Sequence, residues 1–285
     1  MGNTASMGDL AADTAVEQIG DGLYRGSISR DWEIWGPNGG YVASIALRAA
    51  AAATDLPRPA SFSCHYLAAG EFTDVDARVR TLRRTRRAES LAVTLSQGDR
   101  VLLEAQAWFV NDGMDSLEHD HAAAPDVPHW SELKDIDELL PADSPRPFNF
   151  WANFDERPVK WLDDWEHRPP GEPEWKNWVR YTPTATFPDD ISADAARLVV
   201  MLDTVSWPSA VQAHTGRLPW IAPSLDLNVQ FHRFAPEAEW LLPVGRADVA
   251  TEGMFAFNGR IWTDDGRLLA SSSGQCIFRR VELPA

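Results

Sequence analysis

Hydrophobic residues recur along this chain in two successive sets, and each set begins with a helical spacing and continues with an alternating one. In the first set, Val42, Ile45, Ala46 and Ala49 lie on one face of a helix. Hydrophobic and polar residues then alternate through SFSCHYL, DVDARVRTLRR, ESLAVTLSQ and VLLEAQAWFV, with a turn at QGD. One helix followed by several antiparallel strands predicts an α+β unit over residues 20–111.

The second set repeats this order over residues 147–285. Leu198, Met201, Leu202 and Val205 share one face of a predicted helix in DAARLVVMLDTVSWPSAV. The alternating stretches SLDLNVQFHR, EWLLPVGRADVA, MFAFNGRIW and LLASSSGQCIF follow it. Residues 112–146, between the two sets, are acidic, spaced by prolines and poor in aliphatic side chains, which is typical of a linker. Residues 1–19 are interpreted as an N-terminal tail.

Both sets close on a similar motif. GDRVLLEAQAWF ends the first set and DGRLLASSSGQCIF ends the second, and each contains a turn, an arginine, a pair of aliphatic residues and a glutamine. An internal repeat of this kind indicates a duplicated fold. The two copies differ enough that only one of them need keep the chemistry, so the sequence predicts one active site shared between unequal halves.

The chain is acidic, with 42 Asp and Glu against 26 Lys and Arg among 285 residues and a net charge of −16. Such a protein repels nucleic acid and anionic membranes, so neither is an expected partner. The N-terminus lacks the basic and apolar regions of a signal peptide, and the longest apolar stretch, residues 41–53, is rich in alanine and interrupted by Arg48. Cys64 and Cys276 are the only cysteines, which favours a reducing compartment and a cytoplasmic location.

Several stretches resemble the acyl-CoA thioesterase II family, within the wider thioesterase-like group of double-hotdog proteins. They are GLYRG, WGPNGGYVASIAL and CHYL followed by TLRR in the first half, and SLDLNVQFHR, EWLL, the TDDG turn and LLASSSGQ in the second. The resemblance covers residues 22–280 and is weakest across the linker. It implies an α+β double-hotdog fold, in which a curved antiparallel sheet wraps round a long helix twice and the two sheets join.

The resemblance also implies a catalytic group that holds a water molecule. An Asp on the second helix falls on Asp203 in MLDTV, and a hydroxyl residue falls on Ser224 in APSLD, where the family more often has Thr. A Gln near the last strand falls on Gln275 if one extra residue is admitted in SSSGQ, which a bulge at Ser273 and Gly274 would accommodate. The implied substrate is acyl-CoA, with no cofactor beyond the coenzyme A that it carries. The implied assembly is a homodimer or a higher homo-oligomer.

The residues themselves suit such chemistry. A thioester is already activated, so the enzyme must orient and deprotonate a water molecule and stabilise an oxyanion. A carboxylate on an apolar helix face has a raised pKa and is a better base near neutral pH, which is the role expected of Asp203. Ser224 and Gln275 would each fix the water by a hydrogen bond. Backbone N–H groups at a helix N-terminus would bind the thioester oxygen, and the candidates are Asn38, Gly39, Gly40 and Tyr41.

Each of these residues also has an ordinary structural interpretation, which the sequence leaves open. An Asp in a helix is usually exposed or a cap, and a glycine pair is usually a plain turn. Ser224 follows a proline and would simply open a strand. A cluster of arginines is either a solvated hairpin edge protected by charge or a binding site for the phosphates of coenzyme A, and it comprises Arg83, Arg84, Arg86 and Arg87.

Other motifs exclude competing chemistry. His119 and His121 in EHDH lack a second ligand pair at the spacing of a zinc site, so no metal is expected. The absence of a Gly-x-Ser-x-Gly motif argues against a serine α/β-hydrolase, and the Asp and His motif of a hotdog hydratase is missing. Cys64 and Cys276 are interpreted as packing residues. The remaining alternative function is a non-catalytic acyl-CoA-binding hotdog protein.

Tryptophan is unusually dense near the start of the second set, with six between Trp130 and Trp178. We expect these side chains to pack where the linker meets the second sheet, because large aromatic surfaces are usually buried. A role in lining an acyl groove is the alternative.

Overall fold

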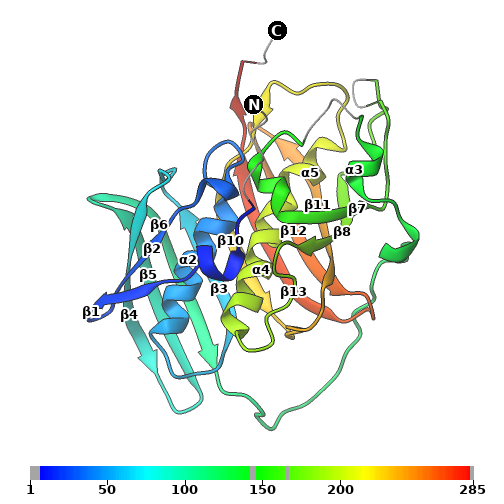
Figure 1. Ribbon diagram of the computed structural model, residues 1–285. Coiled ribbons are helices and arrows are strands. Elements are labelled where there is room, and N and C mark those ends of the chain that lie inside the picture. The colour runs from blue at the N-terminus through cyan, green and yellow to red at the C-terminus, as the bar shows by residue number, and fades with distance from the viewer. Residues whose placement is uncertain (1–6, 142–145, 165–166, 283–285) are drawn as a thin grey trace.

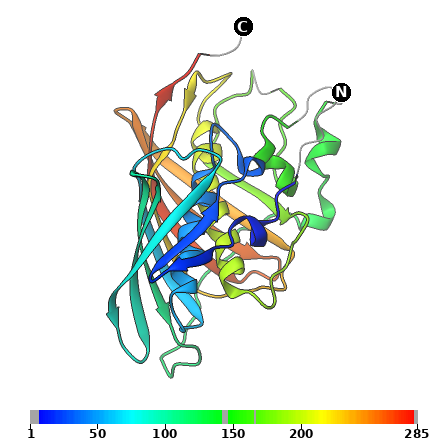
Figure 2. The same cartoon turned by 60° about the vertical axis from the view of Figure 1, so that its left-hand side comes forward.

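A long antiparallel sheet wraps around two helices in this protein, as Figure 1 and Figure 2 show. The computed structural model describes residues 7–141, 146–164 and 167–282. The end of the predicted linker at 142–145, Trp165 and the first six residues of the predicted tail lie outside the described residues. The 12 strands of the sheet lie in the order β1-β2-β4-β5-β6-β3-β10-β13-β12-β11-β8-β7.

The first half of the chain forms one side of the sheet and a helix in its hollow. Its helices are α1 (Leu10–Asp13), a 3₁₀ turn η1 (Arg30–Trp32) and α2 (Gly39–Ala52). Its strands are β1 (Glu17–Gly20), β2 (Leu23–Ser27), β3 (Arg58–Tyr66), β4 (Asp74–Arg84), β5 (Ala88–Gln97) and β6 (Arg100–Val110).

The second half forms the other side. Its helices and 3₁₀ turns are η2 (Trp130–Glu132), α3 (Ile136–Leu139), η3 (Asn149–Asn153), α4 (Ile191–Thr204) and α5 (Ser206–Val211). Its strands are β7 (Phe154–Pro158), β8 (Glu174–Tyr181), β10 (Ser224–Phe231), β11 (Trp240–Thr251), β12 (Met254–Thr263) and β13 (Leu268–Ile277). A separate pair, β9 (Trp220–Ile221) and β14 (Arg279–Arg280), lies outside the large sheet.

The strand order confirms the predicted duplication. From the middle of the sheet outward, β3-β6-β5-β4-β2 on one side corresponds to β10-β13-β12-β11-β8 on the other. Each half therefore places one long helix between its first and second main strands and then adds three more strands in sequence. The halves join where β3 and β10 pair antiparallel, as in the register of Cys64 with Leu227. This arrangement is the expected α+β double hotdog.

The helices α2 and α4 pack side by side and antiparallel in the hollow of the sheet (Figure 1). The Ser44 hydroxyl in α2 donates to the carbonyl oxygen of Ala196 in α4 at 3.1 Å. At the start of α2, a Cβ on Gly40 would lie 2.8 Å from the Cα of Val200 and 2.9 Å from the Cβ of Asp203. Glycine at position 40 therefore permits a helix contact that a larger residue would prevent.

The segment after β6 is largely exposed and without regular structure through Asp126, and from Val127 onward it packs against the second half of the chain. The Trp130 indole stacks on Trp240 with ring centroids 5.1 Å apart, and the indole N–H of Trp178 donates to the carbonyl oxygen of Pro128 at 3.0 Å. Trp178, Trp240 and Trp262 form a cluster on the sheet face opposite α4. The expectation that tryptophans pack where this segment meets the second sheet is confirmed for Trp130 and Trp178.

No helix in the described residues combines the length and the apolar character that crossing a membrane would need.

Replacing Gly40 with alanine should destabilise the fold by about 1–3 kcal/mol, because the new methyl group overlaps the backbone of α4. Urea unfolding at neutral pH would measure this loss. Gly20→Ala is the matched control, since a Cβ there would meet Leu23 at an ordinary 3.6 Å. Equal unfolding midpoints for the two variants would contradict the proposed contact.

Candidate active site

The carboxylate of Asp203 is held at the junction of the two halves. Asp203 is the last residue but one of α4, and its side chain is buried against the start of α2. Its Oδ2 atom accepts a hydrogen bond from the backbone N–H of Gly40 at 2.8 Å. Its Oδ1 atom accepts one from the hydroxyl of Ser224, the first residue of β10, also at 2.8 Å. The structure thus brings together Asp203, Ser224 and the start of α2, which the sequence assigned to one site.

Burial raises the pKa of Asp203 to about 6, and the hydrogen bonds from Ser224 and Gly40, together with the nearby Tyr66 hydroxyl, oppose this rise. None of the described groups that act on this carboxylate is basic. An aspartate with such a pKa is mostly ionised at neutral pH and accepts a proton more readily than an exposed one. Asp203 can therefore serve as a general base.

A cavity of about 830 Å³ opens beside Asp203. Its wall is largely apolar and includes the indoles of Trp35, Trp151 and Trp207. Trp35 and Trp207 meet edge to face with ring centroids 5.8 Å apart. A concave apolar site of this size, with one carboxylate at its wall, fits a small ligand with a hydrophobic group. Of the tryptophans between Trp130 and Trp178, only Trp151 is among the described residues that line the cavity.

Gln275 does not face this site. It is exposed on β13, whereas its neighbours Gly274 and Cys276 are buried. β13 pairs with β12 without irregularity along this stretch, so the bulge that would have turned Gln275 inward is absent. The irregularity lies on β10, between Ser224 and Asp226. Because side chains alternate along a strand, the structure contradicts the predicted place of Gln275 in the catalytic group.

The start of α2 offers fewer free N–H groups than the sequence predicted. The amide of Gly40 is bound to Asp203, and the amide of Tyr41 donates to the side-chain oxygen of Asn38 at 2.9 Å. The Tyr41 ring points away, stacked on Trp32. Asn38 and Gly39 line the cavity, and no described residue accepts a hydrogen bond from the amide of Gly39. Of these four described residues, only Gly39 therefore keeps a backbone N–H for a ligand oxygen.

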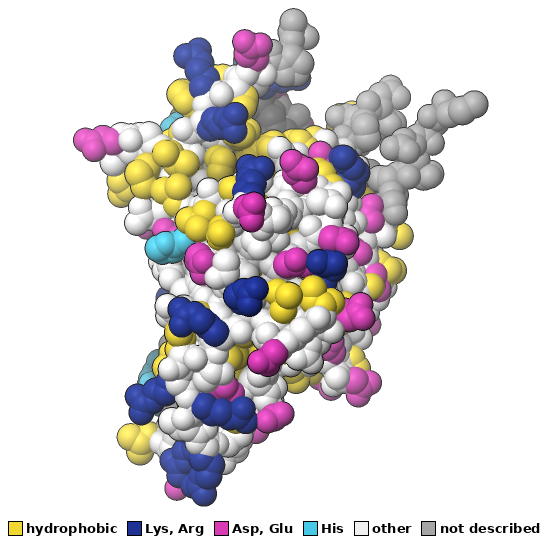
Figure 3. All heavy atoms as spheres, turned by 90° about the vertical axis from the view of Figure 1, so that its left-hand side faces the viewer, with side chains coloured by type: hydrophobic (Ala, Val, Ile, Leu, Met, Phe, Trp, Pro, Cys, Tyr) yellow, Lys and Arg dark blue, Asp and Glu magenta, His cyan; other side chains and the backbone are white. Residues whose placement is uncertain are grey.

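The arginine cluster lies far from Asp203. Arg84 pairs with Asp55, which follows the C-terminus of α2, at 2.9 Å. The 14 residues of α2 separate this end from the cavity by about 20 Å. Lys and Arg side chains gather toward the lower end of the face in Figure 3, where the hairpin between β4 and β5 lies. None of the four predicted arginines lines the cavity.

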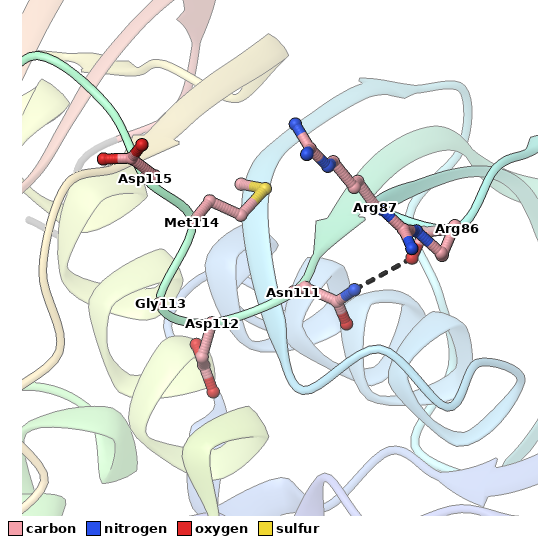
Figure 4. A pocket seen from close by; sticks show the side chains of 7 residues that line it. All are labelled: Arg86, Arg87, Asn111, Asp112, Gly113, Met114 and Asp115. Atoms are coloured by element: carbon pink, nitrogen blue, oxygen red, sulfur yellow. Dashed lines mark hydrogen bonds between the residues drawn. The ribbon is translucent and has the colours of Figure 1, made fainter.

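Figure 4 shows the surroundings of Arg86 and Arg87, at the edge of a shallow hollow. Asn111 donates to the carbonyl oxygen of Arg86 at 2.8 Å, and the carboxylates of Asp112 and Asp115 line the same hollow. Acidic groups there would repel phosphate. Within one chain, this geometry favours a charged hairpin edge over a phosphate site for the cluster.

The duplicated half carries no second copy of the site. α2 and α4 both have 14 residues, and the position of Asp203 in α4 corresponds to Ala51 in α2. Ser192 occupies the position that corresponds to Gly40. Without a carboxylate at position 51, the symmetric place cannot provide the same base. This agrees with the prediction of one site per chain.

Three side chains beside Asp203 were not assigned to the site from the sequence. Tyr66 ends β3 and lines the cavity. The Cys276 thiol lies 3.7 Å from the Ser224 hydroxyl, and Cys64 lies on β3 two residues before Tyr66. Both cysteines are free and buried, and burial raises the pKa of each thiol. The two cysteines are neutral packing residues, as expected. Tyr66 could have been predicted only from the alternation of side chains along β3, which places it on the same face as Cys64.

Asp203 should make stability depend on pH. Its ordinary pKa is 3.8 and its pKa in the folded protein is about 6, so the folded protein binds this proton more tightly. The resulting stabilisation is complete below about pH 4 and is lost as the pH rises through about 6, by on the order of 3 kcal/mol. Urea unfolding of the wild type and of Asp203→Asn across this range would isolate the effect. A free-energy difference that is constant with pH would contradict it.

Family models match both halves of the chain. Residues 28–110 match the acyl-CoA thioesterase N-terminal domain, and residues 119–278 match the acyl-CoA thioesterase C-terminal domain. Among curated protein sequences none matches this chain.

Solved structures share the fold. A hot dog protein of unknown function from Alicyclobacillus acidocaldarius is 22% identical, with a TM-score of 0.78 over 97% of this chain and 98% of that one. An acyl-CoA thioesterase II from Mycobacterium marinum is 23% identical, with a TM-score of 0.77 over 95% of this chain and 98% of that one. The two matched domains together span most of the sequence, and the chain therefore belongs to the acyl-CoA thioesterase family and is a thioester hydrolase.

Proposed function

We propose that this protein hydrolyses acyl-CoA thioesters with a water molecule activated by Asp203, without a covalent intermediate. The observation that carries the proposal is the buried Asp203 carboxylate, fixed by Ser224 and Gly40 at the wall of an apolar cavity. Two fixed donors orient the carboxylate before the substrate arrives, so little ordering remains to be done in the reaction.

The reaction requires one proton acceptor and one oxyanion donor. As water attacks the carbonyl carbon, a carbon–oxygen bond forms, the π electrons of the carbonyl group move to its oxygen, and Asp203 takes a proton from the water. The Gly39 amide then stabilises the oxyanion by a hydrogen bond. The carbon–sulfur bond then breaks, its electron pair leaves with sulfur, and sulfur takes the proton from Asp203. The products are a carboxylic acid and the free thiol of coenzyme A.

The cavity has an apolar wall and a charged opening, which suit the acyl group and the phosphates of the substrate respectively. The acyl group would lie against the indoles of Trp35 and Trp207, which form the apolar wall. Arg217 and Arg279 line the same cavity and are exposed, so they can meet the phosphates of coenzyme A at its opening. They take the role that the sequence gave to the arginine cluster at the far end of α2.

Asp203→Asn should lower kcat for acyl-CoA on the order of a hundredfold or more, because the amide cannot accept the proton. Release of free thiol from short, medium, long and aromatic acyl-CoAs measures this directly. Gln275→Ala is the matched control and should retain wild-type kcat, since Gln275 faces away from the cavity.

The same assay separates hydrolysis from the alternative of a non-catalytic acyl-CoA binder. Binding of acyl-CoA by the wild type without thiol release from any member of the panel would support the binder. Full activity in Asp203→Asn would retain the function but remove Asp203 from the mechanism.

Arg279→Ala should raise KM for acyl-CoA roughly threefold to tenfold and leave kcat unchanged, because an exposed guanidinium contributes binding to a phosphate but none to the reaction. Arg83→Ala, at the distant hairpin, should leave KM unchanged. The reverse pattern, with KM raised only in Arg83→Ala, would return the phosphate site to the hairpin.

Three further expectations stay predictions. The reaction as written uses no cofactor beyond the coenzyme A of its substrate. Two buried free cysteines fit a reducing, cytoplasmic environment. A homodimer or higher homo-oligomer remains the expected assembly.

A further inference from the structure

The Tyr66 hydroxyl is buried beside the active site without a well-formed hydrogen bond. Tyr66 is the last residue of β3, and its side chain lines the cavity. Among the described residues, none is a hydrogen-bond partner of its hydroxyl oxygen. A buried polar group without a partner costs folding free energy, so its presence at this point indicates a role in the site.

The packing of the ring brings this hydroxyl close to Asp203. A Cβ on Gly39 would lie 3.3 Å from the Tyr66 Cζ atom and 2.9 Å from Oδ2 of Asp203. Gly39 therefore lies against both the phenol and the carboxylate, which places the two groups near each other at the start of α2. A side chain at position 39 would separate them.

The phenol keeps its proton here and can donate it in a hydrogen bond. Burial, followed by the negative charge of Asp203, raises the pKa of Tyr66 well above its ordinary value. The hydroxyl therefore keeps its proton wherever Asp203 is ionised. Tyr66 in turn opposes the rise in the pKa of Asp203, as a donor to the ionised carboxylate must.

We infer that Tyr66 is a positioning residue of this active site, whose hydroxyl donates to the Asp203 carboxylate and holds it in the orientation that accepts a proton from water. The inference rests on the proposed function. Tyr66 gives the site a third polar side chain, which comes from the first half of the chain. Gln275 was expected to fill this role but does not face the site.

The other titratable groups around Asp203 cannot replace this hydroxyl. They are the thiols of Cys64 on β3 and Cys276 on β13, with Asp226 on β10 acting on both thiols. Neither a neutral thiol nor a carboxylate favours ionisation of Asp203. Without the phenol, Asp203 would keep only Ser224 and the backbone of Gly40 as donors.

Tyr66→Phe should shift the acidic limb of the kcat/KM profile upward by roughly one pH unit. The value of kcat/KM should then fall severalfold at pH 6 and change less than about threefold at pH 8, while KM stays nearly constant. Tyr24→Phe is the matched control, since its hydroxyl donates to the Ala52 carbonyl oxygen at the far end of α2. A purely structural role for Tyr66 would lower activity equally at both pH values, which would overturn the inference.

Stability and a double variant make the test independent of turnover. At pH 4, where Asp203 is protonated in both proteins, Tyr66→Phe should melt close to the wild type, whereas Tyr24→Phe should melt lower because it loses its hydrogen bond to Ala52. The free energy of unfolding changes with pH as Asp203 loses its proton, and the midpoint of this change should lie at a higher pH in Tyr66→Phe than in the wild type. This shift should vanish when Asp203→Asn is also present.

The two proposals can fail separately. If no acyl-CoA is hydrolysed but the unfolding shift appears, the proposed function fails and the coupling of Tyr66 to Asp203 stands. If acyl-CoA is hydrolysed and neither the kinetic nor the unfolding profile moves in Tyr66→Phe, the function stands and the role of Tyr66 is refuted.

Discussion

The hydrogen bond from the Gly40 amide to Asp203 is the contact on which this site depends. Asp203 lies near the C-terminus of α4, where the helix dipole disfavours a negative charge. The antiparallel packing places the N-terminus of α2, with its opposite dipole, against the same carboxylate. One helix end thus raises the energy of the ionised group and the other lowers it. The close approach at Gly40 sets this balance, because a wider separation of the helices would leave the buried charge without its backbone donor.

The same helix pair has a different chemistry at its other end. There Arg48 of α2 pairs at 2.6 Å with Asp190, the N-cap of α4. The position that corresponds to Asp203 is Ala51, so this end contributes an ion pair and a cap and has no base. The duplicated fold therefore has two equivalent helix contacts. The contact at Arg48 and Asp190 stabilises the fold, whereas the contact at Gly40 and Asp203 provides the reactive carboxylate.

Periodicity was sufficient to predict the two long helices, the long strands and the duplication, because these follow from which face of each element is apolar. It did not predict that the second helix divides into α4 and α5. Asp203 and Ser224 could be predicted because each lies in a short stretch, MLDTV or APSLD, to which the family resemblance assigns a site residue. The orientation of Gln275 was not, since it depends on one residue of register, and the irregularity that sets it lies on the neighbouring strand between Ser224 and Asp226. The position of the arginine cluster could not be predicted for a different reason. The sequence gives its charge but does not show that α2 separates it from the cavity.

The site requires both halves of the chain. Asp203 and Ser224 come from the second half, while the amides of Gly39 and Gly40 come from the first. The β3–β10 pairing fixes their relative position through a continuous ladder, so a shift of either strand would move a donor away from the carboxylate. Two identical halves would have to place the same residues at both ends of the helix pair, including a buried carboxylate, which costs folding free energy. A fused chain with unequal halves bears this cost only once, so the end of the helix pair beside Ala51 can carry the Arg48–Asp190 ion pair instead.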